Sequence, residues 1–217
     1  MASSEQQAAR TTANPRSATG GEPSRVCLFG GTFDPIHLGH THIAQAAVQQ
    51  LGLDRVIFLP CKQSPHKPGH QHASASDRLA MCRLATAGLG WAEVDDFDII
   101  APAPSYSWRT AEAMAERFPN ARMFWLMGTD QWHALPRWDR PDHLASLVEF
   151  IVFNRGDTPG DLPGYRLHAI PGHHPASATA IRESAPGDLP TAWLAPEVAD
   201  YIRANQLYHQ KTKTIPD

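Results

Sequence analysis

Two glycines and two histidines stand close together near the start of the chain, in the stretch GGTFDPIHLGH from Gly30 to His40. An apolar run precedes the glycines, and a helical pattern begins at the histidines. Glycines let a backbone approach a ligand closely, and a helix N-terminus offers free N–H groups and a positive dipole end. His37 and His40, three residues apart, would share one face of the first turn. This pattern predicts a phosphate site with two imidazole donors.

Other chemistries remain open for these histidines. The stretch is neither a Walker A loop nor a G-x-G-x-x-G turn, because the glycine spacing is wrong and no Gly-Lys-Ser/Thr follows. Two histidines could ligate zinc, although no partner cluster of Cys, Asp or Glu is evident. They could also be solvated residues at a helix start. The other histidine groups, HQH at 70–72 and HH at 173–174, are interpreted as loop residues, with metal binding as the alternative.

Strand-like and helix-like segments alternate along the chain. Because the strands are apolar on both faces, the pattern predicts a parallel sheet covered by helices on both sides. The expected strands are 25–30, 55–60, 92–99, 121–128, 149–155 and 165–170. The expected helices are 38–52 (ended by Gly52), 76–88 (capped by Ser76), 107–118, 177–184 and 196–208, with a polar loop over 61–75.

Polar residues follow three of these strands directly, in the segments GGTFDPIHLGH, PCKQSPHK and GTDQWH. Ligands of such sheets bind beyond the carboxyl ends of the strands. We therefore expect the three segments to meet at one site.

Composition narrows the function classes. The 217 residues are 42% apolar with a net charge of −3, so a general nucleic-acid binder is not favoured. No run reaches the ~18 apolar residues of a membrane span, and no secretory signal is evident. Three cysteines without C-x-x-C spacing fit a reducing compartment, so we expect a cytoplasmic protein.

Residues 1–24 are predicted to be a disordered tail, with a transit peptide as the alternative. Residues 25–217 are predicted to form a single domain.

The motifs together resemble a known family. GGTFDPIHLGH is similar to the H-x-G-H nucleotidyltransferase superfamily and, more narrowly, to nicotinate-nucleotide adenylyltransferases. Four further segments agree with that family in order: PHK (65–67), APSYSWRT (103–110), GTDQWHALPRW (128–138) and ASATAIRE (176–183). The resemblance spans about 25–208 and implies a Rossmann-like, doubly wound α/β fold of the nucleotidyltransferase type.

The resemblance also implies a reaction. A mononucleotide phosphate would attack the α-phosphorus of ATP, and pyrophosphate would leave. Mg²⁺ is expected with ATP, held mostly by phosphates and water rather than by a cage of protein ligands. The implied catalytic residues are His37, His40 and Arg182. The implied ATP-binding residues are Gly30, Gly31, Thr32, Phe33, Gly39, His40, Gly128, Asp130, Ser177, Thr179, Ile181 and Arg182.

The second substrate implied is nicotinate mononucleotide. Trp138 is the candidate to stack on its pyridine ring and Trp132 the alternative, although either could belong to the core. The other implied contacts are Phe33, Lys67, Ser105, Tyr106 and Ser107.

Two features keep alternatives open. Ser-x-Thr before an apolar run is also ordinary helix capping, and Asp130 could be a helix N-cap. The segment Ser107-Trp108-Arg109-Thr110 departs from the family, which has an acid or amide where Arg109 stands. Arg109 either points away from the site or alters its substrate end.

Competing functions share the fold. They are the same chemistry on nicotinamide mononucleotide or phosphopantetheine, cytidylyl transfer, and a non-catalytic nucleotide sensor. A sensor is expected to lose a histidine or the arginine, whereas His37, His40 and Arg182 are all present. No membrane partner is expected, and a homo-oligomer is left open.

Overall fold

The computed structural model describes residues 23–63, 73–154, 156, 159–184 and 188–208. The predicted tail, apart from its last two residues, and most of the 61–75 loop therefore lie outside the described residues. So do the HQH cluster and Lys67.

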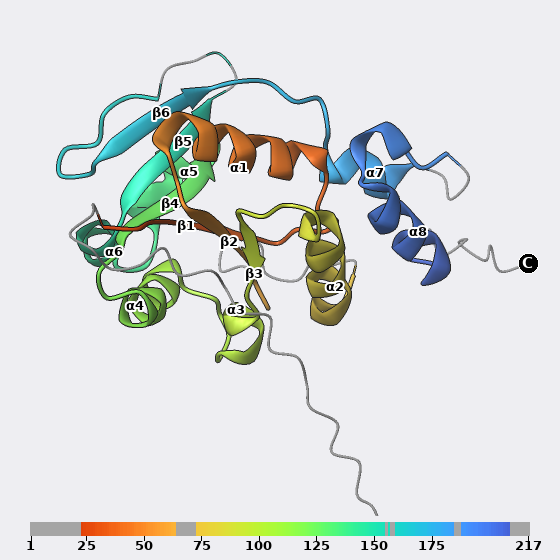
Figure 1. Ribbon diagram of the computed structural model, residues 1–217, viewed down its shortest axis with the longest axis horizontal. Helices are drawn as coiled ribbons and strands as arrows, with labels where there is room; N and C mark the ends of the chain where they lie inside the picture. Colours follow the sequence, from red (N-terminus) through yellow and green to blue (C-terminus); the bar gives the residue numbers. More distant parts are fainter. Residues whose placement is uncertain (1–22, 64–72, 155, 157–158, 185–187, 209–217) are drawn as a thin grey trace, which may run out of the picture.

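The described strands form one parallel sheet with helices on both faces (Figure 1). Its six strands run in the order β3-β2-β1-β4-β5-β6, the order of a doubly wound nucleotide-binding fold. The predicted fold class is thereby confirmed. The strands are β1 Arg25–Gly31, β2 Arg55–Pro60, β3 Ala92–Val94, β4 Arg122–Gly128, β5 Glu149–Asn154 and β6 Leu167–Pro171.

The helices connect these strands. In chain order they are α1 Leu38–Leu51, α2 Ala75–Thr86, α3 Phe97–Ile100, α4 Ser107–Arg117, α5 Thr129–Ala134, η1 Leu135–Arg137, α6 Pro141–Leu147, α7 Ala178–Glu183, η2 Thr191–Trp193 and α8 Pro196–Ala204. In the part of the chain described, no helix has the length and apolar character needed to cross a bilayer.

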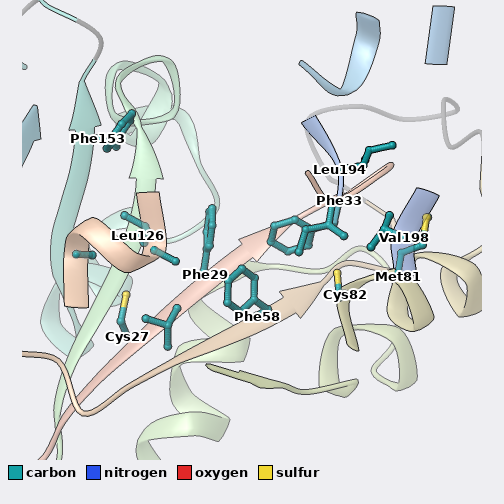
Figure 2. Close-up of a cluster of buried hydrophobic side chains, with 14 of the residues drawn as sticks. Cys27, Phe29, Phe33, Phe58, Met81, Cys82, Leu126, Phe153, Leu194 and Val198 are labelled. Atoms are coloured by element: carbon teal, nitrogen blue, oxygen red, sulfur yellow. The ribbon is translucent and has the colours of Figure 1, made fainter. Parts of the chain in front are cut away.

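Alternate residues of each central strand enter different halves of the core. Phe58 and Leu126 face α1, α2 and α8 in one half, and Figure 2 shows this cluster. Their neighbours Ile57 and Trp125 face α4, α5 and α6 in the other half. This period-two alternation on a sheet covered on both sides explains why the strands are apolar throughout.

Two local predictions were wrong, and two short helices were missed. The expected strand over 92–99 ends at Val94, and residues 97–100 form the short helix α3. Helix α2 is capped by Ser74, whose Oγ accepts the N–H of Asp77 at 3.1 Å, rather than by Ser76. Helices α5 and α6 were not predicted, because six or seven residues are too few to display a helical period.

Candidate active site

Two adjoining cavities open at the carboxyl ends of β1 and β4, the neighbouring strands between which the strand order reverses. Phe29, His40 and Gly128 line both cavities. The first cavity measures about 620 Å³ and the second about 300 Å³, sizes within the range of small-molecule sites. Two ligands bound here would meet at His40.

The first cavity is bounded by the N-terminus of α1, the start of α5 and the segment before α7. Its lining residues are Phe29, His37, Gly39, His40, Ile43, Gly128, Thr129, Asp130, His133, Phe153, His174, Pro175, Ala176, Ser177 and Ala178. The second cavity lies between the ends of β1, β2 and β4. It is lined by Phe29, Gly30, Gly31, Thr32, His40, Cys61, Asp98, Ser105, Ser107, Trp125, Met127, Gly128, Gln131 and Trp138.

His37 and His40 form a stacked pair on the first turn of α1. Their ring centroids lie 3.8 Å apart at an interplanar angle of 27°. His37 is the N-cap residue, and its backbone N–H donates to Nδ1 of His40 over 3.2 Å. Because Nδ1 of His40 accepts this bond, the proton of the neutral ring lies on Nε2. His40 is thus a neutral N–H donor where the two cavities meet.

The surroundings of His40 favour its neutral form. Burial, together with the nearby rings of His37 and His174, holds the pKa of His40 well below its usual range. The rings of Phe29 and Phe33 pack against it, with centroids at 6.0 and 5.0 Å. A neutral ring of this kind can donate a hydrogen bond at neutral pH but does not supply a positive charge.

The glycine pair makes room for two aromatic rings. A Cβ on Gly30 would lie 2.9 Å from Cζ2 of Trp125, and one on Gly31 would lie 3.0 Å from Cζ of Phe33. Gly30, Gly31 and Thr32 line the second cavity. Phe33 itself lines neither cavity, because its ring is turned into the core against Phe29 and Phe58 (Figure 2).

Other elements hold the loop between β1 and α1. The fully buried Arg78 of α2 donates from Nη1 to the Thr32 carbonyl at 2.6 Å. Arg182 donates from Nη1 to the Asp34 carbonyl at 2.7 Å. The Asp34 carboxylate accepts the backbone N–H of Ala73 at 3.2 Å. The loop that presents His37 is therefore fixed from distant parts of the chain.

Residues of the SATAIR segment have different positions. Ser177 lines the first cavity and caps α7 by accepting the N–H of Ala180. Thr179 is exposed, with its Oγ1 3.4 Å from Nη2 of Arg182. Ile181 is fully buried in the core, and Arg182 lies in the last turn of α7. Neither Ile181 nor Arg182 lines a cavity in this conformation.

The segment after β4 contributes lining residues to both cavities. Asp130 is exposed at the first cavity, and the N-cap of α5 is Gly128 rather than Asp130. Trp138 is half-buried and lines the second cavity. Trp132 lines neither cavity. It is fully buried, and its Nε1 donates to the Gly160 carbonyl at 2.8 Å.

The SYSWRT segment borders the second cavity. Ser105 and Ser107 line it, and Oγ of Ser105 donates to the Asp98 carbonyl at 3.1 Å. Tyr106 and Arg109 do not line it. Arg109 donates to the Pro102 carbonyl at 2.8 Å, with its guanidinium 5.5 Å from the Tyr106 ring. Of the two orientations left open for Arg109, the structure has the one that points away from the cavity.

Sequence reasoning missed several lining residues. In the second cavity the main one is Asp98, whose carboxylate accepts the hydroxyl of Thr110 at 2.5 Å. Burial raises the pKa of Asp98 to about 6. In the first cavity the main one is His174, which the sequence pattern indicates as a loop residue, with metal binding as the alternative. Nothing in the local sequence marks either residue, because each reaches its cavity through the arrangement of the strands.

The residues that line the first cavity show what kind of divalent metal site they could form. The part of the chain that the structure describes contains no group of three or more His, Cys, Asp or Glu suited to a metal ion. The first cavity offers one exposed carboxylate, Asp130, and several imidazoles. These residues fit a metal that arrives with a phosphate chain rather than one held by the protein alone.

A sheet of this order with cavities at the carboxyl ends of its central strands is typical of nucleotide-binding α/β proteins. The family model described as "Cytidylyltransferase-like" matches residues 28–184. A protein of Methylacidiphilum infernorum named "Probable nicotinate-nucleotide adenylyltransferase" is 40% identical, with 85% of this chain and 92% of the relative covered. A relative of the same name from Neisseria meningitidis serogroup B is 38% identical, with 86% and 99% covered.

A solved structure shares the fold. The Plasmodium falciparum nicotinic acid mononucleotide adenylyltransferase complexed with NaAD aligns with a TM-score of 0.69 at 19% identity. The alignment covers 85% of this chain and 97% of that one. The chain therefore belongs to the cytidylyltransferase-like family and, within it, to the nicotinate-nucleotide adenylyltransferases.

Proposed function

We propose that the chain transfers AMP from ATP to nicotinate mononucleotide, giving nicotinate adenine dinucleotide and pyrophosphate, as a step of NAD biosynthesis. The observation that carries the proposal is the position of His40 where the two cavities meet. Transfer between two nucleotides needs both substrates side by side with a donor at the junction. The names of the relatives support the choice of substrates.

The proposed arrangement puts ATP in the first cavity and the mononucleotide in the second. A phosphate oxygen of the mononucleotide attacks the α-phosphorus, the bond to the β-phosphate bridging oxygen breaks, and pyrophosphate leaves with the electron pair. The nucleophile is already an anion near neutral pH, so alignment and charge stabilisation suffice. No general base is required.

Each lining group then has a proposed task. His37, Nε2–H of His40 and the first turn of α1 donate to the ATP phosphates. Gly39, Gly128, Asp130 and Ser177 shape the ATP side, and Gly30, Gly31 and Thr32 the floor between the substrates. Trp138 stacks on the pyridine ring, while Ser105 and Ser107 contact its carboxylate.

Arg182 and Thr179 retain a proposed role at the β- and γ-phosphates. This role requires the guanidinium to turn from the Asp34 carbonyl toward Ser177 at the cavity edge. Mg²⁺ is the proposed metal, and when bound it would neutralise charge on the phosphates.

The test is pyrophosphate release from ATP and Mg²⁺ with three separate acceptors: nicotinate mononucleotide, nicotinamide mononucleotide and phosphopantetheine. We expect fast release with nicotinate mononucleotide. Equal use of both pyridine nucleotides would broaden the substrate assignment. Release with phosphopantetheine alone would show that phosphopantetheine, and not nicotinate mononucleotide, is the acceptor. ATP binding without pyrophosphate release for any of the three acceptors would indicate a nucleotide sensor.

A further inference from the structure

His174 lies in the segment between β6 and α7 and lines the first cavity. Its neighbour His173 is exposed and does not line the cavity. The two consecutive histidines therefore have different surroundings, and only His174 is available to a ligand in the cavity.

A backbone hydrogen bond determines where the His174 ring carries its proton. The N–H of Ala176 donates to Nδ1 of His174 over 3.1 Å. The proton of the neutral imidazole must then lie on Nε2. This repeats the arrangement of His40, whose Nδ1 accepts the backbone N–H of His37. Two imidazoles of one cavity thus have the same tautomer, each set by a backbone donor.

The His174 ring also lies beside the first turn of α1. A Cβ added to Gly39 would lie 2.9 Å from ring atoms of His37 and 3.3 Å from Nδ1 of His174. The rings of His37 and His174 therefore flank Gly39, at the helix end that attracts anions. A side chain at Gly39 would separate them, so the glycine keeps both rings at the same end of the cavity.

The charge state of His174 suits a hydrogen-bond donor. Burial lowers the pKa of His174, and the neighbouring His42 and His173 lower it further. The centroids of the His42 and His174 rings lie 5.4 Å apart. A lowered pKa favours the neutral form of the His174 ring, which can donate through Nε2–H but carries no positive charge.

We propose that His174 is a third imidazole donor to the polyphosphate of ATP, acting through Nε2–H beside His37 and His40. This inference rests on the proposed function only in taking ATP as the occupant of the first cavity. It makes His174 a substrate-binding residue, one that the H-x-G-H motif does not contain.

Three variants separate ligand binding from a structural role. His174→Ala removes both ring nitrogens. His174→Asn keeps an oxygen near the position of Nδ1, so it can still accept the Ala176 N–H but does not reach the ligand. His174→Gln puts an amide N–H near the position of Nε2. His173→Ala is the matched control, because it removes an adjacent, exposed imidazole.

The measurement is calorimetric binding of Mg²⁺–ATP, which needs no acceptor and no turnover. We expect His174→Ala and His174→Asn to weaken ATP binding about ten- to a hundredfold, the range for one hydrogen bond to a charged group. His174→Gln should recover part of the loss, and His173→Ala should bind as the wild type does. Wild-type binding by His174→Asn would overturn the proposal, since the ring would then serve only the Ala176 bond.

Pyrophosphate binding identifies the part of ATP that is contacted. If His174 donates to the polyphosphate, His174→Asn weakens pyrophosphate in parallel with ATP. Weakened ATP with unchanged pyrophosphate would overturn the proposal in favour of a nucleoside contact.

Turnover with nicotinate mononucleotide, measured separately, reports on the proposed function. Normal turnover together with wild-type ATP binding by His174→Asn would leave that function standing and overturn the role of His174. Conversely, a wild type that turns over no acceptor, but whose affinity for ATP and pyrophosphate falls on His174→Asn, would overturn the proposed function and support the role of His174.

Discussion

His37 and His40 combine two tasks in one turn of helix, since they fix the start of α1 and present donors to the cavities. His40 accepts the N–H of His37 on one ring nitrogen and keeps the other protonated. This explains why the two residues must be three apart, because N-cap and N3 are the positions whose groups meet at a helix start. The spacing could be read from the sequence, but the tautomer could not.

Removing either imidazole tests the catalytic assignment. We expect His37→Ala and His40→Ala each to lower kcat by about 10²–10³, the usual cost of losing one preorganised donor to developing charge. Steady-state pyrophosphate release measures the effect, and the thermal unfolding midpoint shows whether the variant remains folded. A folded variant with a near-normal rate would remove that histidine from the mechanism.

Asp98 gives the second cavity a charge that depends on pH. Burial raises its pKa to about 6, so its carboxyl is neutral below about pH 6 and ionised above. An ionised Asp98 would repel the ring carboxylate of nicotinate mononucleotide but not the carboxamide of nicotinamide mononucleotide. We expect the ratio of KM for nicotinate mononucleotide to KM for nicotinamide mononucleotide to rise on the order of tenfold between pH 5 and 7.

The comparison of the two acceptors isolates this effect, because both carry the same titrating phosphate. Asp98→Asn should give a ratio that is flat across the same pH range. A rise that persists in Asp98→Asn would mean that another group near the second cavity titrates.

At the scale of elements, the helices and strands that could be predicted from the sequence were the long ones with a clear apolar pattern or clear end residues. The strands β1, β2, β4 and β5 and the helix α1 are long, with unbroken apolar runs or a clear start and stop, and they were predicted with small boundary errors. Helices α5 and α6 are short and depend on tertiary contacts, so the sequence shows no helical repeat of apolar residues that would predict them. His174 was missed for a related reason, since only the pairing of β6 beside β5 brings its loop to α1.

The first turn of α4 is tied to the segment that carries Trp138. Nε1 of Trp108 donates to Asp139 over 2.7 Å, and the Arg140 guanidinium lies 4.4 Å from the centroid of the Trp108 ring. Arg140 has a φ of 49°, so the chain turns sharply just after Trp138. The Trp108 side chain thereby connects two walls of the second cavity.

Weakening this connection should affect one substrate only. We expect Trp108→Phe, which keeps a ring but loses the N–H, to raise KM for the mononucleotide about three- to tenfold and leave KM for ATP unchanged. Trp91→Phe is the matched control, because Nε1 of Trp91 donates to Gln45 at 2.9 Å away from both cavities. Equal changes in both KM values, or the same effect in Trp91→Phe, would contradict a local role for Trp108.

At the scale of the whole molecule, the loop between β1 and α1 is contacted by side chains from distant parts of the chain, including the last described residue. Arg78 from α2, Arg182 from α7 and Tyr208 beyond α8 all bond to it. This loop is part of a motif that resembles the family, yet the sequence gives no sign of these contacts, because 174 positions separate Tyr208 from Asp34. Long-range polar contacts of this kind follow from the assembled fold rather than from any local period.

Tyr208 allows a direct test of that assembly. Its hydroxyl donates to the buried carboxylate of Asp34 at 2.8 Å, and burial raises the pKa of Tyr208, which keeps the hydroxyl protonated. We expect Tyr208→Phe to lower the free energy of unfolding by about 1.5–3 kcal/mol, the range for a hydrogen bond to a charged group. Because Asp34 precedes His37 in the same loop, kcat should also fall by at least about threefold.

The chain offers a matched control in Tyr201, whose hydroxyl donates to Asp77 of α2 at 3.0 Å from the same C-terminal region. Both bonds join a tyrosine near the C-terminus to an aspartate, but only that of Tyr208 reaches the loop before α1. Urea unfolding and pyrophosphate release on both variants therefore separate general anchoring of the C-terminus from support of the site. If Tyr201→Phe slowed turnover as much as Tyr208→Phe, the contact with Asp34 would have no special role, and the C-terminal segment would act on the site only through overall stability.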